Sequence, residues 1–209
     1  MKSIAIFVEG GGATRRSGQD RLRQGFDALL GAQKDAARRR RLGWQLGLYG
    51  SRGEAFKAFR HATRKNQVDL AVLLVDAEEP VTDNTPGGRV AHLKTRDGWA
   101  FENADANRVH LMTQCMDAWI VADGDKLEEF YGKGFQKNAL PKRDVLDEQP
   151  KNSLYGAIER ATKDTKKGAY AKVTHASELL KRVRPGIVAT RCRSFQQLIQ
   201  WLDAAIAEA

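Results

Sequence analysis

The segment Asp-Leu-Ala-Val-Leu-Leu-Val at residues 69–75 is the part of the sequence that most constrains the fold. Its unbroken apolar run is typical of a central parallel strand that is covered on both faces. Strand patterns precede it at residues 3–8 and 44–49, and amphipathic helix patterns separate the three strands at residues 17–41 and 52–65. This β-α-β-α-β order predicts an α/β protein with a doubly wound, mostly parallel sheet flanked by helices.

The rest of the chain has weaker patterns. Residues 79–107 hold several prolines and glycines, so we expect a long irregular loop with a functional or partner-binding role. The patterns after it predict a strand at 109–115, a helical stretch to residue 131, and helices at 153–162, 169–183 and 194–207, with Pro185-Gly186 as a break. We expect a single domain over residues 1–209, with a core over about 1–132 and a helical C-terminal appendage over about 150–209.

The composition bears on the compartment and the partner. The 209 residues include 35 Lys+Arg and 26 Asp+Glu, a formal net charge of +9 that favours a polyanionic partner such as nucleic acid. Hydrophobic residues make up 42%, which excludes a disordered chain. No apolar run approaches the roughly 20 residues of a membrane span, and the first residues lack a secretory pattern. Cys115 and Cys192 are too few for a disulfide framework or a zinc site, so we expect a cytoplasmic protein with no membrane partner.

Acidic residues stand where the predicted strands end. Glu9 follows the first strand, Asp76 and Glu78 follow the third, and Asp117 follows the fourth. The carboxyl ends of parallel strands share one edge, and carboxylates gathered there repel one another unless a cation neutralises them. Two-residue spacing lets Asp76 and Glu78 point the same way. Because hard divalent ions prefer oxygen ligands, the sequence predicts a Mg²⁺ or Mn²⁺ site formed by these four carboxylates.

Each of these acids also has an ordinary structural interpretation. An acidic residue after a strand is often a helix cap or a solvated loop residue, and only the combination favours a site. Glu9 is followed by three glycines, a turn that could surround a phosphate. However, the chain has neither a Gly-x-x-x-x-Gly-Lys-Ser/Thr nor a Gly-x-Gly-x-x-Gly pattern, which disfavours a nucleotide-binding P-loop or dinucleotide site.

Two short motifs carry a resemblance to a known family. Phe-Val-Glu-Gly at 7–10 and Val-Asp-Ala-Glu at 75–78 resemble the Toprim pattern, which has a Glu after the first strand and an Asp-x-Asp after a later one. Glu78 stands in place of the second Asp. Over nearly its whole length the chain is similar to a bacterial domain-of-unknown-function family with a Toprim-like, Rossmann-like core, related to OLD-type Toprim nucleases. Further matching stretches are residues 92–99, 110–119 and 167–172, and His175.

The resemblance implies Mg²⁺-dependent phosphoryl transfer on nucleic acid. Glu9, Asp76 and Glu78 would hold one or two metals that activate a water and stabilise charge on the phosphate. Asp117 stands where the family usually has Glu, and Lys172 is the candidate for the lysine that stabilises the transition state in OLD-type relatives. Similar Toprim nucleases are toxic effectors of bacterial anti-phage defence. They imply a partner ATPase that controls the activity and a homodimer as the active form.

Basic residues near the predicted metal site are candidates for contacts with nucleic-acid phosphates. Arg15 and Arg16 follow the glycine turn, and Lys94 and Arg96 lie in the predicted long loop. Cys115 is disfavoured as a nucleophile, because an acidic site raises the pKa of a thiol.

The function predicted from the sequence is a Mg²⁺-dependent Toprim-like nuclease that cleaves phosphodiester bonds of DNA or RNA, with tRNA among the candidate substrates. The main alternative is a non-catalytic basic subunit that binds nucleic acid or protein in a defence complex, with structural carboxylates. A third alternative is a small-molecule phosphotransferase or phosphatase that uses the same metal site.

Overall fold

The computed structural model describes residues 2–10, 16–101 and 106–209. Within these residues, four parallel strands form one sheet in the order β2-β1-β3-β4. The strands are β1 (Ser3–Glu9), β2 (Gly43–Tyr49), β3 (Leu70–Asp76) and β4 (Val109–Met112). The predicted α/β class with a parallel sheet is confirmed, and the apolar segment forms β3, which pairs with β1 on one side and β4 on the other.

Helices connect the strands and make up the chain after β4. The elements before β4 are α1 (Arg16–Leu29), α2 (Gly31–Arg39), α3 (Arg52–Arg64), α4 (Pro86–Asp97) and the 3-10 turn η1 (Ala106–Arg108). Those after β4 are α5 (Asp117–Val121), α6 (Gly124–Tyr131), η2 (Lys137–Ala139), η3 (Leu146–Glu148), α7 (Lys151–Thr162), α8 (Lys172–Leu180), α9 (Pro185–Arg191) and α10 (Arg193–Glu208). Across the described ranges, we find no helix with the length and apolar character needed to cross a membrane.

Helices cover both faces of the sheet, which explains why β3 is apolar up to Asp76, its last residue. Leu73 of β3 belongs to an apolar cluster with Phe59 of α3 and Leu93 of α4. Leu74, the next residue, points to the opposite face and belongs to a larger cluster with Phe26 of α1. These side chains are buried, and each stabilises the fold by roughly 1.5–3 kcal/mol relative to an exposed position.

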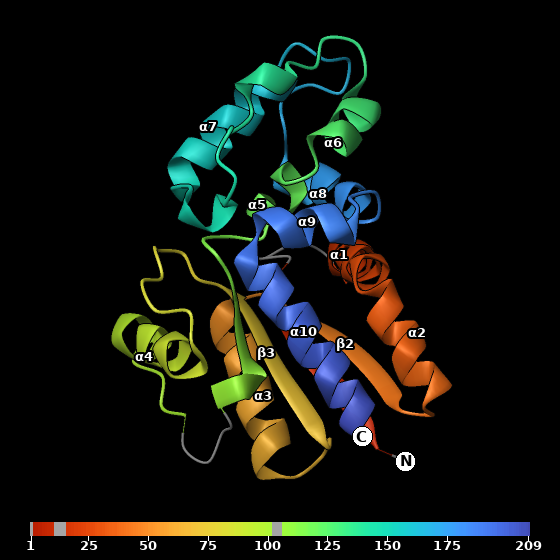
Figure 1. Ribbon diagram of the computed structural model, residues 1–209, viewed down its shortest axis with the longest axis vertical. Coiled ribbons are helices and arrows are strands. Elements are labelled where there is room, and N and C mark those ends of the chain that lie inside the picture. Colours follow the sequence, from red (N-terminus) through yellow and green to blue (C-terminus); the bar gives the residue numbers. More distant parts are fainter. Residues whose placement is uncertain (1, 11–15, 102–105) are drawn as a thin grey trace.

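The helical C-terminal part is not set apart from the sheet. Leu202 of α10 belongs to the same apolar cluster as Ile4 of β1, and Lys2 Nζ donates a hydrogen bond of 2.9 Å to the Ala209 carbonyl oxygen. Figure 1 shows α10 crossing the sheet, both chain ends at one end of the sheet, and α6 and α7 beyond the other. The region predicted as an appendage therefore completes the core, while α7 extends past the carboxyl ends of the strands.

Two predicted helices are divided in the structure. The helix expected over residues 17–41 bends at the fully buried Leu30, and Gly31, a poor helix former, begins α2. The helical stretch expected after β4 is interrupted at Asp123, which caps α6. The break expected at Pro185-Gly186 is present between α8 and α10, and Pro185 begins the short helix α9 there, because proline is favoured at the first helical position.

The prediction of an irregular loop over residues 79–107 is wrong where α4 lies. The Thr85 side chain accepts a hydrogen bond of 3.2 Å from the Gly88 backbone N–H, and Pro86 is the first helical residue. Gly98, with a φ of 68°, ends the helix in the left-handed conformation that glycine adopts readily. The prolines and glycines that indicated a loop therefore start and stop a helix. Lys94 and Arg96 lie in its last turn.

Candidate active site

Glu9 and Asp76 lie side by side at the carboxyl edge of the sheet, as the strand pattern predicts. They end the neighbouring strands β1 and β3, and the Asp76 backbone N–H donates a hydrogen bond of 3.1 Å to Glu9 Oε2. The Asp76 side chain is 6% exposed, and its Oδ1 accepts a hydrogen bond of 2.8 Å from the Met116 backbone N–H. Parallel pairing thus brings together two carboxylates that are 67 residues apart.

The carboxyl groups of Glu9 and Asp76 both have raised pKa values, because each lies in a buried site close to other carboxylates. Burial and the neighbouring Asp76 carboxylate raise the pKa of Glu9 to about 7, although Arg52 acts in the opposite direction. The pKa of Asp76 is also raised, by burial and by Asp117, against the influence of Lys172. A group whose charged form is disfavoured by burial and by like charges gains from a nearby cation. The pair is therefore a favourable place for added positive charge.

Lys172 supplies part of that charge from α8. Its ammonium lies 3.1 Å from Asp117 Oδ2 and 3.5 Å from Asp76 Oδ2. Burial lowers the pKa of Lys172, but the Asp76 and Asp117 carboxylates outweigh it and raise that pKa above its ordinary value. Lys172 therefore stays protonated and bridges the two carboxylates.

Asp117 is held from the other side by two tyrosines of the helical part. Its side chain is fully buried, its Oδ2 accepts a hydrogen bond of 2.7 Å from the Tyr155 hydroxyl, and its Oδ1 accepts one from the Tyr170 hydroxyl. Burial and the Asp117 charge raise the pKa of both tyrosines, which therefore remain donors at neutral pH. Together with Lys172, these partners occupy three of the about four acceptor positions of the Asp117 carboxylate, so a metal ion there would compete with them.

Glu78 is directed to a different cation. Its side chain forms an ion pair with the Lys151 ammonium, and its backbone N–H donates a hydrogen bond of 2.8 Å to the Gln114 carbonyl oxygen. The backbone of Lys151 is itself held, because its N–H donates to Gln114 Oε1 at 3.1 Å. Glu78 adopts a φ of 67°, a left-handed conformation that is uncommon outside glycine. Asp76 and Glu78 thus engage different lysines in spite of their two-residue spacing.

The donor set can be tested against the metal ion that the resemblance implies. Among the described residues, no three His, Cys, Asp or Glu side chains are arranged as a ready metal site. Mg²⁺ commonly binds through one or two carboxylates and keeps several waters, and Glu9 with Asp76 provides that number. The Lys172 ammonium also shows that a cation is accommodated beside Asp76. Glu9 and Asp76 therefore fit a Mg²⁺ ion, whereas Glu78 is engaged by Lys151.

The predicted phosphate-binding residues are dispersed. Arg15 lies outside the residues that the structure describes. Arg16 is the first residue of α1, and the structure describes its backbone and not its side chain. Lys94 is exposed on α4. Arg96, also on α4, forms an ion pair of 2.7 Å with Asp97.

Sequence reasoning missed several residues that touch the site. Lys151, Tyr155 and Tyr170 contact carboxylates that lie 73, 38 and 53 residues away along the chain. No local spacing marks such contacts, because they depend on how α7 and the segment before α8 dock against the sheet edge. Arg52, whose charge acts on Glu9, begins α3 and carries no motif either.

Cys115 behaves as predicted. Burial, Asp117 and Asp76 raise the pKa of its thiol to about 12, so the thiolate needed for nucleophilic attack does not form at neutral pH.

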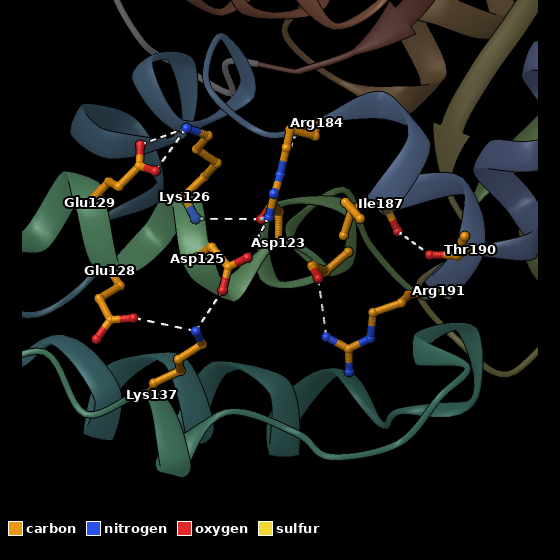
Figure 2. Close-up of polar contacts among 11 residues, drawn as sticks. Asp123, Asp125, Lys126, Glu128, Glu129, Lys137, Arg184, Ile187, Thr190 and Arg191 are labelled. Carbon is orange, nitrogen blue, oxygen red and sulfur yellow. Dashed lines mark hydrogen bonds and ion pairs between the residues drawn. The ribbon is translucent and has the colours of Figure 1, made fainter.

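A second charged cluster, on α6 and around α9, has a structural role. Figure 2 shows Arg184 directed at Asp123 and Asp125, and Lys137 between Asp125 and Glu128. The guanidinium of Arg184 donates to both oxygens of the buried Asp123, at 2.8 and 2.7 Å, and its backbone N–H adds a third bond of 2.9 Å. The cluster fastens the start of α9 to the start of α6, and its carboxylates are already paired with cations.

The fold and the site define the class to which the protein belongs. The chain is a parallel α/β protein whose sheet edge carries buried carboxylates bridged by lysines. The model of the family described as a domain of unknown function, DUF4276, matches residues 17–203, and the chain belongs to that family. Comparisons with curated proteins and with solved structures give no match.

Proposed function

We propose that the protein is a Toprim-like, metal-dependent nuclease that hydrolyses phosphodiester bonds of DNA or RNA. The observation that carries the proposal is the pair Glu9 and Asp76 at the carboxyl edge of the sheet, with the Lys172 ammonium 3.5 Å from Asp76 Oδ2. Buried carboxylates and a neighbouring lysine would supply metal ligands and a positive charge for the phosphate, both of which assist phosphodiester hydrolysis. The net charge of +9 supports a polyanionic substrate.

Each residue has a distinct part in this proposal. Glu9 and Asp76 would hold Mg²⁺ or Mn²⁺, which when bound supplies Lewis-acid activation of water. Lys172 stabilises the negative charge that develops on the phosphate oxygens. Asp117, through its ion pair with Lys172 and its hydrogen bonds from the tyrosines, holds that ammonium in place.

The resemblance to Toprim effectors extends the proposal to the biological setting. We place the protein in the cytoplasm of a bacterium, as the toxic nuclease of an anti-phage system. A partner ATPase would restrain it, and a homodimer would be the active form.

The test is metal-dependent cleavage by the wild type and by Asp76→Ala. The wild type is incubated with plasmid, single-stranded DNA and tRNA in Mg²⁺ or Mn²⁺, and EDTA abolishes the cleavage. Asp76→Ala lowers the rate by about 10²-fold or more, since it removes a metal ligand and the partner of Lys172. Asp35→Ala, which removes an exposed carboxylate on α2, is the matched control and leaves the rate unchanged. Cleavage that survives Asp76→Ala would show that the metal site does not carry the chemistry.

A non-catalytic binding subunit is the second candidate, and one observation favours it. The pairs Lys172–Asp76 and Lys151–Glu78 neutralise carboxylates without any metal. If the wild type cleaves nothing with either metal, alone or after release from a partner, and Asp76→Ala still binds oligonucleotides, this candidate is preferred. Hydrolysis of a small phosphomonoester, without cleavage of polymers, would instead favour a phosphatase.

A further inference from the structure

Two arginines meet on one carboxylate beside the candidate active site. The Arg52 Nη2 lies 2.8 Å from Asp97 Oδ2, and the Arg96 Nη1 lies 2.7 Å from Asp97 Oδ1. The three side chains are only 15%, 25% and 13% exposed for Arg52, Arg96 and Asp97. Asp97 therefore holds one guanidinium with each of its oxygens.

Part of the hydrogen-bonding capacity of these guanidiniums is unused. Within the described part of the chain, Arg52 Nε, Arg52 Nη1 and Arg96 Nε are buried and have no hydrogen-bond partner. A guanidinium carries five N–H donors and no acceptor, and a buried donor left unpaired is unfavourable. Two further carboxylates act on the arginine pair. Glu79 Oε1 is 3.9 Å from Arg96 Nε on a carboxylate that is 66% exposed, and Glu9 interacts electrostatically with Arg52.

Arg52 is kept in a fixed orientation by an aromatic support. Its guanidinium carbon lies 5.4 Å from the centre of the Trp99 ring, which in turn stacks on Phe56 at 4.2 Å with an angle of 3° between the planes. Cation–π contact and the Asp97 ion pair together restrict the side chain. An arginine held in this way binds an oxyanion with less loss of conformational freedom than a mobile surface residue.

The arginine pair is continuous with the carboxyl edge of the sheet. Arg52 begins α3 directly after the turn that follows β2, and its charge acts on Glu9. Arg96 lines a pocket of about 350 Å³ together with His92. The His92 Nε2 lies 3.0 Å from the carbonyl oxygen of Ala77, the residue that follows Asp76. Arg52 and His92 therefore both lie on connections that follow the carboxyl ends of strands.

We propose that Arg52 and Arg96, joined by Asp97, form a binding site for a phosphodiester group of a nucleic acid chain, adjacent to the phosphate at the Glu9–Asp76 site. Arginine guanidiniums bind phosphate oxygens through charge-assisted hydrogen bonds, and both side chains keep part of their surface exposed, 15% for Arg52 and 25% for Arg96. Two guanidiniums share the one Asp97 carboxylate, so these three side chains together carry one positive charge that a phosphodiester can neutralise. The choice of a nucleic acid chain rests on the proposed function, whereas the oxyanion site itself does not.

The test measures oxyanion binding in the absence of metal, so that it is independent of cleavage. Inorganic phosphate and a dT₁₂ oligonucleotide without terminal phosphates are titrated into the EDTA-treated protein by calorimetry at constant ionic strength. Arg52→Gln and Arg96→Gln each weaken binding of both probes at least about tenfold, and Arg52→Lys does not restore it, because lysine lacks the paired donors. Arg38→Gln, at an exposed position of α2, is the control and binds like the wild type. Circular dichroism confirms that each variant is folded.

The outcomes separate this site from the nuclease proposal. Phosphate and oligonucleotide binding that depends on Arg52 and Arg96, in a protein that cleaves nothing, supports the site and rejects only the nuclease. A nuclease whose KM for oligonucleotides is unchanged in both arginine variants overturns the site alone. Binding of inorganic phosphate without the oligonucleotide overturns the assignment to a phosphodiester, as does equal binding by wild type and variants.

Discussion

Lowering the pH should destabilise the fold through His110, which the sheet buries in its neutral form. The side chain is 2% exposed on β4, and its ring centre lies 5.5 Å from that of Trp201. Burial and the nearby Arg89 guanidinium lower the pKa of His110 to about 3, although a hydrogen bond with the Asn107 backbone acts in the opposite direction. Among the described residues, no acceptor faces its Nε2. A proton added there would place a second positive charge, buried and without an acceptor, near the Arg89 guanidinium.

The size of the effect follows from the two pKa values. In the unfolded chain the imidazole titrates near 6.5, so below that pH the unfolded state binds a proton that the folded state does not. Stability from this group is therefore lost as the pH falls from 6.5 towards 3. At pH 5, which is about 1.5 pH units below the unfolded value, the loss is about 2 kcal/mol, since each unit corresponds to about 1.4 kcal/mol.

The assay compares wild type with His110→Gln by urea unfolding at pH 8 and pH 5, with tryptophan fluorescence as the signal that reports unfolding. Gln keeps polar groups at this position but does not titrate. The stability difference between the two proteins should shift in favour of the variant by about 2 kcal/mol at pH 5. Glu9 acts with the opposite sign, because a raised pKa gives stability that is lost as the pH rises through about 7. Both proteins contain Glu9, so its contribution cancels.

The reasoning is refuted if the stability difference is the same at both pH values to within about 0.5 kcal/mol. In that case either the imidazole is protonated in the folded state or it exchanges with solvent through local opening.

Three further predictions concern the site and the core. Lys172→Met should reduce cleavage by about 10²-fold while lowering the Mg²⁺ concentration needed for half-maximal activity, because a cation that competes for Asp76 is gone; an unchanged rate contradicts the role of Lys172. Asp117→Asn should lower the cleavage rate but change that Mg²⁺ concentration by less than about threefold, whereas a metal ligand would shift it by at least about tenfold. Leu198→Ala, at a fully buried position of α10, should lower the free energy of unfolding by about 3 kcal/mol in urea titrations. A loss below about 1 kcal/mol would show that α10 is not part of the core.

The sheet was largely predictable from the sequence, because strand patterns of β1, β2 and β3 alternate with helix patterns of suitable length. The helix α4 was not, since Pro86 and Gly98 favour a loop in one context and a helix start and stop in another. Only the cap from Thr85 distinguishes the two.

The candidate site likewise contains residues that the sequence predicts and residues that it does not. Glu9 and Asp76 come together because parallel pairing determines where strand ends meet, and Lys172 lies beside Asp76. Lys151 and Tyr155 could not be placed, because their contacts depend on the docking of α7 across the strand ends. Likewise, the way Asp97 joins Arg52 to Arg96 depends on the relative positions of α3 and α4.

The ion pairs of Lys151 and Lys172 connect cation binding at the carboxyl edge of the sheet to the packing of α7 and α8 against that edge. The carboxylates belong to the sheet and its connections, whereas Lys151 begins α7 and Lys172 begins α8. Any cation that binds Asp76 and Glu78 must compete with these ammonium groups and so weakens two of the contacts that hold α7 and α8 in place. If cation binding at the carboxyl edge of the sheet changes the affinity of α7 and α8 for a partner, that partner changes the affinity of the edge for the cation by the same factor. The two lysines thus make the carboxyl edge and the outer face of the helical part energetically linked sites.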